Sequence, residues 1–246
     1  LGDVYKRQIK DALESYYPNI DFFEGSKMIM QEGDEKDIQS DDFKKAIIKA
    51  KSHDVAIVCL GELPSTERPG DIYTLDLPKE QSLIVKELSK QGIPIVLVLV
   101  QGRPKIIREI ERLSDGVLLA YLPGDQGGNA IADIISGKIN PSGKLPYTYP
   151  RYNGVIMHYD HKQSELINAN TWKNDFYNPQ WNFGFGLSYT SFEYSNLQIS
   201  RDDLYPNKEL KTEINIILKE YIITLMEPLE NSSFFMKKEK LNATLI

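Results

Sequence analysis

The chain has 246 residues, of which 41% are hydrophobic and 26% are charged. These are the proportions of an ordinary globular protein, so they exclude a disordered, collagen-like or coiled-coil chain. The formal net charge of −6, from 35 acidic and 29 basic residues, disfavours a nucleic-acid partner, because a negative surface repels phosphate backbones.

The sequence predicts neither an internal disulfide nor a membrane span. Cys59 is the single cysteine, and its place in an apolar run indicates a buried core residue. The longest apolar run, residues 93–100, is too short to cross a bilayer. The first residues lack the apolar segment of a signal peptide, so any export signal is expected upstream of Leu1.

Strand and helix patterns alternate through the first 140 residues. Three apolar runs without polar alternation are typical of strands buried on both faces, and in chain order they are residues 54–60, 93–100 and 116–122. A helical spacing of apolar residues precedes each run, within residues 43–50, 84–88 and 106–110. A fourth helix is predicted over residues 127–137, with Gly137 as its C-cap. This alternation predicts an α/β fold with a parallel sheet covered by helices.

The character of the chain changes after this region. Residues 144–190 are rich in aromatics, prolines and glycines, which predicts a long ordered loop region over the sheet. Residues 191–200 alternate like a half-exposed strand that opens a β-type domain, whereas residues 213–230 fit either a strand or a helix. About 46 residues follow Ser200, fewer than most domains need, so the last domain is predicted to be incomplete.

The loop GELPSTERPGD, residues 61–71, follows the first predicted strand. Ligands of open α/β sheets bind at the carboxyl ends of the strands, so Glu62 or Glu67 could reach a substrate from this loop. A carboxylic acid whose pKa is raised by burial can protonate a leaving group. The alternative is that both glutamates are exposed loop charges paired with Arg68.

The loops after the other two strands, QGRP (101–104) and PGDQGGNA (123–130), are glycine-rich. Most of these glycines are interpreted as turn residues, and an anion site at the start of the following helix is the alternative. The chain has no GxxxxGK[ST] motif, so nucleotide binding has weak support.

These motifs occur together with NPSGKLPYTYPR, YDHK, YNPQW and FGFGLSYTSFEYSNL in one order along the chain. The series strongly resembles the carboxyl-terminal half of family 3 glycoside hydrolases, the β-glucosidase and exo-β-glucanase group, over about residues 35–200. In that family an amino-terminal (β/α)8 barrel supplies an aspartate nucleophile, and an α/β sandwich domain supplies the general acid/base glutamate. The anomeric configuration is retained.

The resemblance implies specific site residues. Glu67 matches the general acid/base, because the family pattern places that glutamate three residues before Gly-Asp. Glu62, Asp71 and Arg103 are expected to bind substrate or support the loop, with purely structural roles as the alternative. No cofactor or metal is expected, because the three histidines lack ligand spacing. Trp172 and Trp181 are either packing residues or a sugar platform.

The implied fold is a three-layer α/β sandwich with a mainly parallel sheet over residues 9–190. Residues 1–8 depart from the family pattern and are expected to be foreign or disordered. Residues 191–246 are expected to form an incomplete fibronectin type III-like domain or an aberrant tail.

The implied function is part of a retaining β-glycosidase that hydrolyses O-glycosidic bonds at the non-reducing end and is inactive without the barrel. The expected partners are a β-linked glucoside or oligosaccharide and the barrel domain, and the expected location is periplasmic or secreted. One alternative is a noncatalytic module that binds a carbohydrate or a partner domain. A weaker one is a flavodoxin-like binder of nucleotides or phosphate, since fold alone does not choose among functions.

Overall fold

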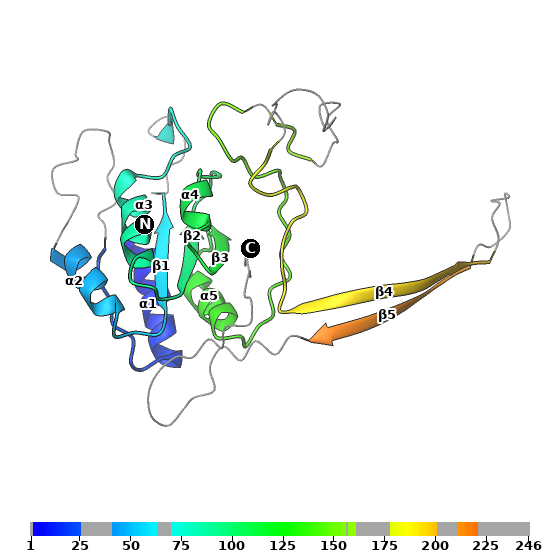
Figure 1. Cartoon of the computed structure of the whole chain (residues 1–246), viewed down its shortest axis with the longest axis horizontal. Helices are drawn as coiled ribbons and strands as arrows, with labels where there is room; N and C mark the ends of the chain where they lie inside the picture. The colour runs from blue at the N-terminus through cyan, green and yellow to red at the C-terminus, as the bar shows by residue number, and fades with distance from the viewer. Residues whose placement is uncertain are drawn as a thin grey trace.

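A parallel three-stranded sheet lies at the centre of the protein (Figure 1). The computed structural model describes residues 2–25, 41–62, 70–155, 157–160, 178–200 and 211–220, with the backbone alone at 2–7 and 220. The strands are β1 (Ala56–Gly61), β2 (Ile95–Val100) and β3 (Gly116–Tyr121), and they neighbour one another in that order. The three predicted strands are therefore confirmed.

The central strand β2 explains why these segments are apolar without alternation. All six of its residues are buried, because it pairs with β1 on one side and β3 on the other and is covered on both faces. Val98 and Val100 point to one apolar cluster, whereas Leu97 and Leu99 point to the other. Each such side chain contributes about 1.5–3 kcal/mol when it is fully buried.

Helices cover both faces of the sheet, so the fold is a three-layer α/β sandwich. The helices α1 (Gly2–Tyr16) and α5 (Gly127–Ile135) lie on one face. The other face is covered by α2 (Asp41–Ala50), α3 (Lys79–Ser89) and α4 (Arg108–Glu111). Because the chain returns to a parallel strand after each helix, the carboxyl ends of all three strands meet at one edge of the sheet.

The helix α1 begins at Gly2, so residues 2–8 are helical where the sequence led us to expect foreign or disordered chain. Ile9 and Leu13 of α1 are buried in the same cluster as residues of α5. At Gly128 of α5, a Cβ would lie 2.4 Å from the Gln8 carbonyl oxygen. The absence of a side chain at that position therefore lets the two helices approach closely.

The described part of the aromatic loop region packs over the α2–α4 side of the sheet. Trp181 is 7% exposed, its carbonyl accepts a hydrogen bond from Tyr149 N at 2.8 Å, and its ring stacks on Phe185 at 6.0 Å between centroids. Trp181 is thus a packing residue. Trp172 lies outside the described residues.

An antiparallel hairpin of β4 (Thr190–Ile199) and β5 (Thr212–Glu220) follows and extends away from the three layers (Figure 1). The segment that fitted either a strand or a helix is therefore a strand where it is described. Tyr189 anchors the base of the hairpin: its ring lies in the α1/α5 cluster and its hydroxyl donates to the Ile134 carbonyl at 2.7 Å. Two strands do not establish a fibronectin type III-like domain, which stays a prediction.

Candidate active site

The backbone at the end of β1 is fixed by a glycine and a buried glutamine. Gly61 has φ +152°, and a Cβ there would lie 1.8 Å from the Val100 carbonyl oxygen. Gly61 N donates to Gln81 Oε1, and Gln81 Nε2 donates to the Gly61 carbonyl, both at 2.9 Å. Gln81, on α3, is 2% exposed. The strand end is therefore rigidly placed just before Glu62.

The Glu62 carboxylate is bound by the turn that follows β2. Its Oε1 accepts hydrogen bonds from Gly102 N at 3.1 Å and from Arg103 N at 2.8 Å. Its Oε2 accepts from Arg103 Nε at 2.8 Å and lies 2.7 Å from Arg103 Nη2. Two guanidinium nitrogens thus share one carboxylate oxygen, and such charge-assisted hydrogen bonds are stronger than those between neutral groups. The contact joins the loops at the ends of two neighbouring strands.

A second cation completes this buried cluster. Lys105 Nζ lies 3.6 Å from Glu62 Oε2, and the two side chains are only 7% and 9% exposed. Burial acts to raise the pKa of Glu62, but the Arg103 hydrogen bonds and the charge of Lys105 outweigh it and hold the pKa below its ordinary value. Burial also lowers the pKa of Lys105, against the opposing effect of Glu62. Glu62 is therefore ionised at neutral pH and cannot serve as a proton donor there.

Arg103 also reaches the far end of the loop. Its Nη1 donates to the Gly70 carbonyl, while its other side-chain nitrogens bind Glu62. Glu62 directly precedes residues 63–69, and Gly70 directly follows them. One guanidinium group thus holds both ends of this segment, which we call the loop clamp (Glu62, Arg103 and Gly70).

The structure describes three of the four predicted site residues. It brings Glu62 and Arg103 together in the loop clamp, and it shows Asp71 exposed directly after Gly70. Glu67, the predicted general acid/base, lies outside the described residues.

Sequence reasoning missed a second set of residues beside the clamp. The Tyr149 hydroxyl donates to the Lys105 carbonyl at 2.6 Å and accepts from Gln101 Nε2 at 2.8 Å. Tyr149 and Gln101 are both 0% exposed. Tyr149 belongs to the motif KLPYTYP and Gln101 to QGRP, but neither motif indicates that these two side chains meet, and no local pattern marks Lys105.

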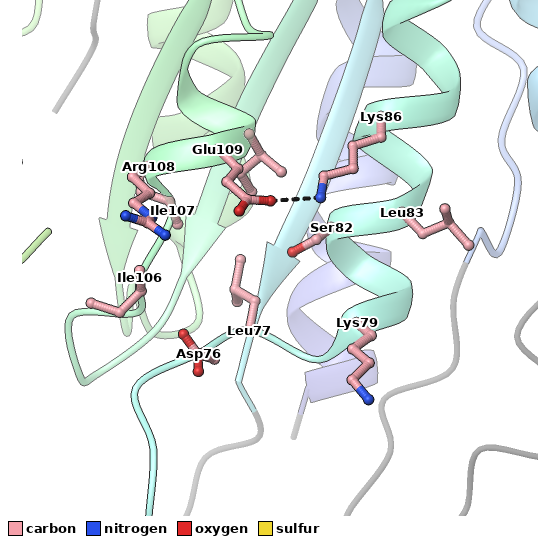
Figure 2. Close-up of a pocket in the computed structure, with 11 residues that line it drawn as sticks. Asp76, Leu77, Lys79, Ser82, Leu83, Lys86, Ile106, Ile107, Arg108 and Glu109 are labelled. Carbon is pink, nitrogen blue, oxygen red and sulfur yellow. Dashed lines mark hydrogen bonds and ion pairs between the residues drawn. The ribbon is translucent and has the colours of Figure 1, made fainter. Parts of the chain in front are cut away.

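A pocket of about 370 Å³ lies between α3 and α4. Figure 2 shows Lys86 and Glu109 joined across it, at 2.6 Å. Its wall combines apolar side chains with charged ones; Figure 2 labels Asp76, Leu77, Lys79, Ser82, Leu83, Ile106, Ile107 and Arg108 among them. The predicted site residues that the structure describes, Glu62, Asp71 and Arg103, do not line this pocket.

Within the described ranges, no group of three or more histidine, cysteine or acidic side chains could hold a metal ion. The same ranges contain no helix that is both long and apolar enough to cross a membrane.

The model of the glycosyl hydrolase family 3 C-terminal domain matches residues 3–189. The chain belongs to this family. It is 45% identical over 158 residues to a lysosomal beta glucosidase of Dictyostelium discoideum, covering 63% of this chain and 18% of that protein. It is 32% identical over 182 residues to a periplasmic beta-glucosidase of Salmonella typhimurium, covering 70% and 24%.

Solved structures of β-glucosidases share the fold. The beta-glucosidase of Listeria innocua in complex with glucose has a TM-score of 0.57 at 30% identity, covering 65% of this chain and 24% of that one. A β-glucosidase of Erythrobacter marinus has a TM-score of 0.63 at 28% identity, covering 85% and 31%. This chain therefore spans less than a third of the length of these relatives.

Proposed function

We propose that this chain is the α/β part of a retaining, β-glucosidase-like glycosidase and that it contributes the general acid/base, Glu67. The observation that carries the proposal is the loop clamp: the segment that contains Glu67 leaves the carboxyl end of β1, and one guanidinium group holds both of its ends. Glu67 itself lies outside the described residues, so its role rests on the family match of residues 3–189.

The reaction proceeds in two steps. Glu67 donates its proton to the glycosidic oxygen while an aspartate of the amino-terminal (β/α)8 barrel attacks the anomeric carbon and forms a glycosyl ester. The ionised Glu67 then takes a proton from water, which attacks the same carbon and releases the sugar with retained configuration. In retaining enzymes the two carboxyl groups lie about 5–5.5 Å apart.

The other predicted site residues act as supports. Glu62 is held ionised by Arg103 and Lys105, so its part is to tie the loop to the turn after β2. Arg103 holds both ends of the loop. Asp71 supports the loop through its position directly after Gly70, whose carbonyl Arg103 binds.

The substrate class follows from the relatives. A β-linked glucoside, cleaved at its non-reducing end, is proposed because the named relatives are beta-glucosidases and one structure holds glucose. A periplasmic or secreted location is proposed from the Salmonella relative, and the Dictyostelium relative, which is lysosomal, leaves other compartments open.

The test joins this chain to a family 3 barrel and compares Glu67→Ala with the unsubstituted fusion. With a cellobiose-type substrate, whose leaving group needs a proton, kcat/KM should fall by about 10²–10⁴-fold. With 2,4-dinitrophenyl β-glucoside, whose leaving group needs none, glycosyl-enzyme formation should be nearly unchanged.

Glu62→Ala serves as the control, because Glu62 is the other carboxylate of the same loop. A selective loss with poor leaving groups in Glu62→Ala but not in Glu67→Ala would show that the assignment is wrong. Equal losses with both kinds of substrate in Glu67→Ala would favour a noncatalytic role for the loop.

A further inference from the structure

The hydroxyl of Tyr149 lies against both ends of the turn after β2. It accepts a hydrogen bond from Gln101 Nε2 at 2.8 Å and donates one to the Lys105 carbonyl at 2.6 Å. Gln101 directly precedes the turn residues 102–104, and Lys105 directly follows them. A single oxygen atom of the aromatic loop region therefore holds the two ends of this turn together.

The same turn supplies the partners of the Glu62 carboxylate. Gly102 N and Arg103 N donate to Oε1, at 3.1 Å and 2.8 Å. Arg103 Nε donates to Oε2 at 2.8 Å, and Lys105 Nζ lies 3.6 Å from the same oxygen. All these partners lie within the segment whose ends the hydroxyl holds. A shift of the turn would therefore move all of them relative to Glu62.

Tyr149 is itself held firmly in place. Its side chain is 0% exposed, and its ring meets the edge of the Trp181 ring at 5.1 Å between centroids. Its backbone N donates to the Trp181 carbonyl at 2.8 Å, and its carbonyl accepts from Gln180 N at 2.9 Å. Packing and hydrogen bonds that lock a side chain in this way make it a precise support for a neighbouring site.

Gln101 occupies its buried position at a cost in stability. It is 0% exposed, and among the described residues its Oε1 has no hydrogen-bond partner. A buried polar atom without a partner destabilises a fold, whereas an apolar side chain carries no such cost. Departures of this kind from the rules of stable packing occur at functional sites. The hydrogen bond to Tyr149 is the contact of this side chain that an apolar residue could not make.

We propose that Tyr149 is a positioning residue for the general acid/base loop: its hydroxyl fixes the turn after β2, and the turn fixes both ends of the loop through Glu62 and Arg103. The inference rests on the proposed function, in which that loop carries Glu67. Because Tyr149 is 0% exposed, it does not touch the substrate and acts through the turn alone.

The structure offers a matched pair of variants. Tyr149→Phe removes the hydroxyl beside the turn and keeps the ring. Tyr189→Phe removes the hydroxyl that donates to the Ile134 carbonyl at 2.7 Å, on the opposite face of the sheet. Each variant thus loses a buried hydroxyl that donates to a backbone carbonyl, and each should lower the thermal unfolding temperature, by roughly 2–6 °C. The turn after β2 should respond to Tyr149→Phe alone.

Amide hydrogen exchange of the full chain, followed by NMR, tests the turn without any activity. The Arg103 amide belongs to the turn, and the Leu97 amide, at the centre of the sheet, serves as the reference for global unfolding. Tyr149→Phe should raise the ratio of the Arg103 rate to the Leu97 rate at least about tenfold, and Tyr189→Phe should change it less than about threefold. Gln101→Met keeps the hydroxyl and should raise the ratio by a smaller factor. A ratio that neither Tyr149→Phe nor Gln101→Met changes would overturn the proposal.

Kinetics of the barrel fusion test the consequence for catalysis. Tyr149→Phe should lower kcat for cellobiose-type substrates about five- to tenfold, with KM changed less than about twofold, because only the placement of the acid is altered. Glycosyl-enzyme formation from 2,4-dinitrophenyl β-glucoside should change less than about twofold, and Tyr189→Phe should affect neither substrate.

Comparison with Glu67→Ala separates this inference from the proposed function. A selective loss with poor leaving groups in Glu67→Ala but not in Tyr149→Phe would overturn the positioning role and leave the proposed function standing. Its absence from Glu67→Ala would overturn the proposed function and the inference with it.

Discussion

At the scale of single residues, Glu62 and Glu67 lie five positions apart in one loop, and the environment of Glu62 fits it for support and not for proton transfer. Glu62 is buried against two cations, which keep it ionised. A general acid needs the opposite environment, one that favours the protonated form at working pH. Of the two glutamates of GELPSTERPGD, Glu62 is therefore unsuited to donate a proton, in keeping with our proposal that Glu67 is the general acid/base.

Glu62→Gln should change the pH dependence of stability. Because the folded-state pKa of Glu62 lies below its ordinary value of 4.5, the ionised form stabilises the fold above that value, and the stabilisation is lost as the pH falls through the folded pKa. Urea unfolding at pH 7 should show the variant about 2 kcal/mol less stable than the unsubstituted chain. The difference should shrink toward zero near pH 2. A difference in unfolding free energy that stays the same from pH 7 to pH 2 would show that the charge of Glu62 does not stabilise the fold.

Arg103→Lys tests whether the clamp positions the loop. Lysine keeps the charge but cannot bind Glu62 and Gly70 at once in the fork geometry of a guanidinium group. In the barrel fusion, kcat/KM for cellobiose-type substrates should fall about tenfold, and that for 2,4-dinitrophenyl β-glucoside should fall less than about threefold, because only the first needs a positioned acid. A variant that only loses stability would lower kcat/KM for the two substrates by the same factor. The control is Lys86→Ala, which breaks the exposed Lys86–Glu109 pair and should leave kcat/KM for both substrates unchanged.

At the scale of elements, the carboxyl end of β1 shows why the loop begins where it does. The Gly61 backbone lies against Val100, and Glu62 N donates to the Val100 carbonyl at 3.2 Å, which extends the β1–β2 pairing to the clamp. Parallel strands bring their carboxyl ends to one edge, so a contact between the loops after β1 and β2 could be expected from sequence. The contacts of Lys105 with Glu62 and of Tyr149 with Lys105 could not be predicted from sequence, because they depend on how the aromatic loop region packs.

Gly61→Ala should therefore disrupt the strand end. The added Cβ would meet the Val100 carbonyl oxygen at 1.8 Å, a clash with backbone that no rotamer change relieves. We expect a loss of about 3 kcal/mol or more in the free energy of unfolding. Gly92→Ala is the control: it also has a positive φ, +75°, but open space around the new Cβ, so it should cost only about 1–2 kcal/mol. Equal losses measured by urea unfolding would show that contact with β2 is unimportant.

At the scale of the whole molecule, the sandwich could be predicted because its strands are continuous apolar runs that only a doubly covered sheet accommodates. Two regions escaped prediction for physical reasons. The start of α1 is one of them: Ile9, Ala12 and Leu13 have helical spacing and are buried, but a pattern of three apolar residues is too short to fix where a helix begins. The state of β5 was ambiguous, since strand formation there depends on pairing with β4 and not on local sequence.

The central claim, that Glu67 is the general acid/base, is tested most directly by the product that Glu67→Ala makes with azide in the barrel fusion. Without the base, water attacks the glycosyl ester slowly, and azide, which needs no base, should take its place. With 2,4-dinitrophenyl β-glucoside as donor, NMR should show β-glucosyl azide, and the turnover rate should rise with azide concentration. Glucose as the sole product, at a rate that azide leaves unchanged, would contradict the assignment.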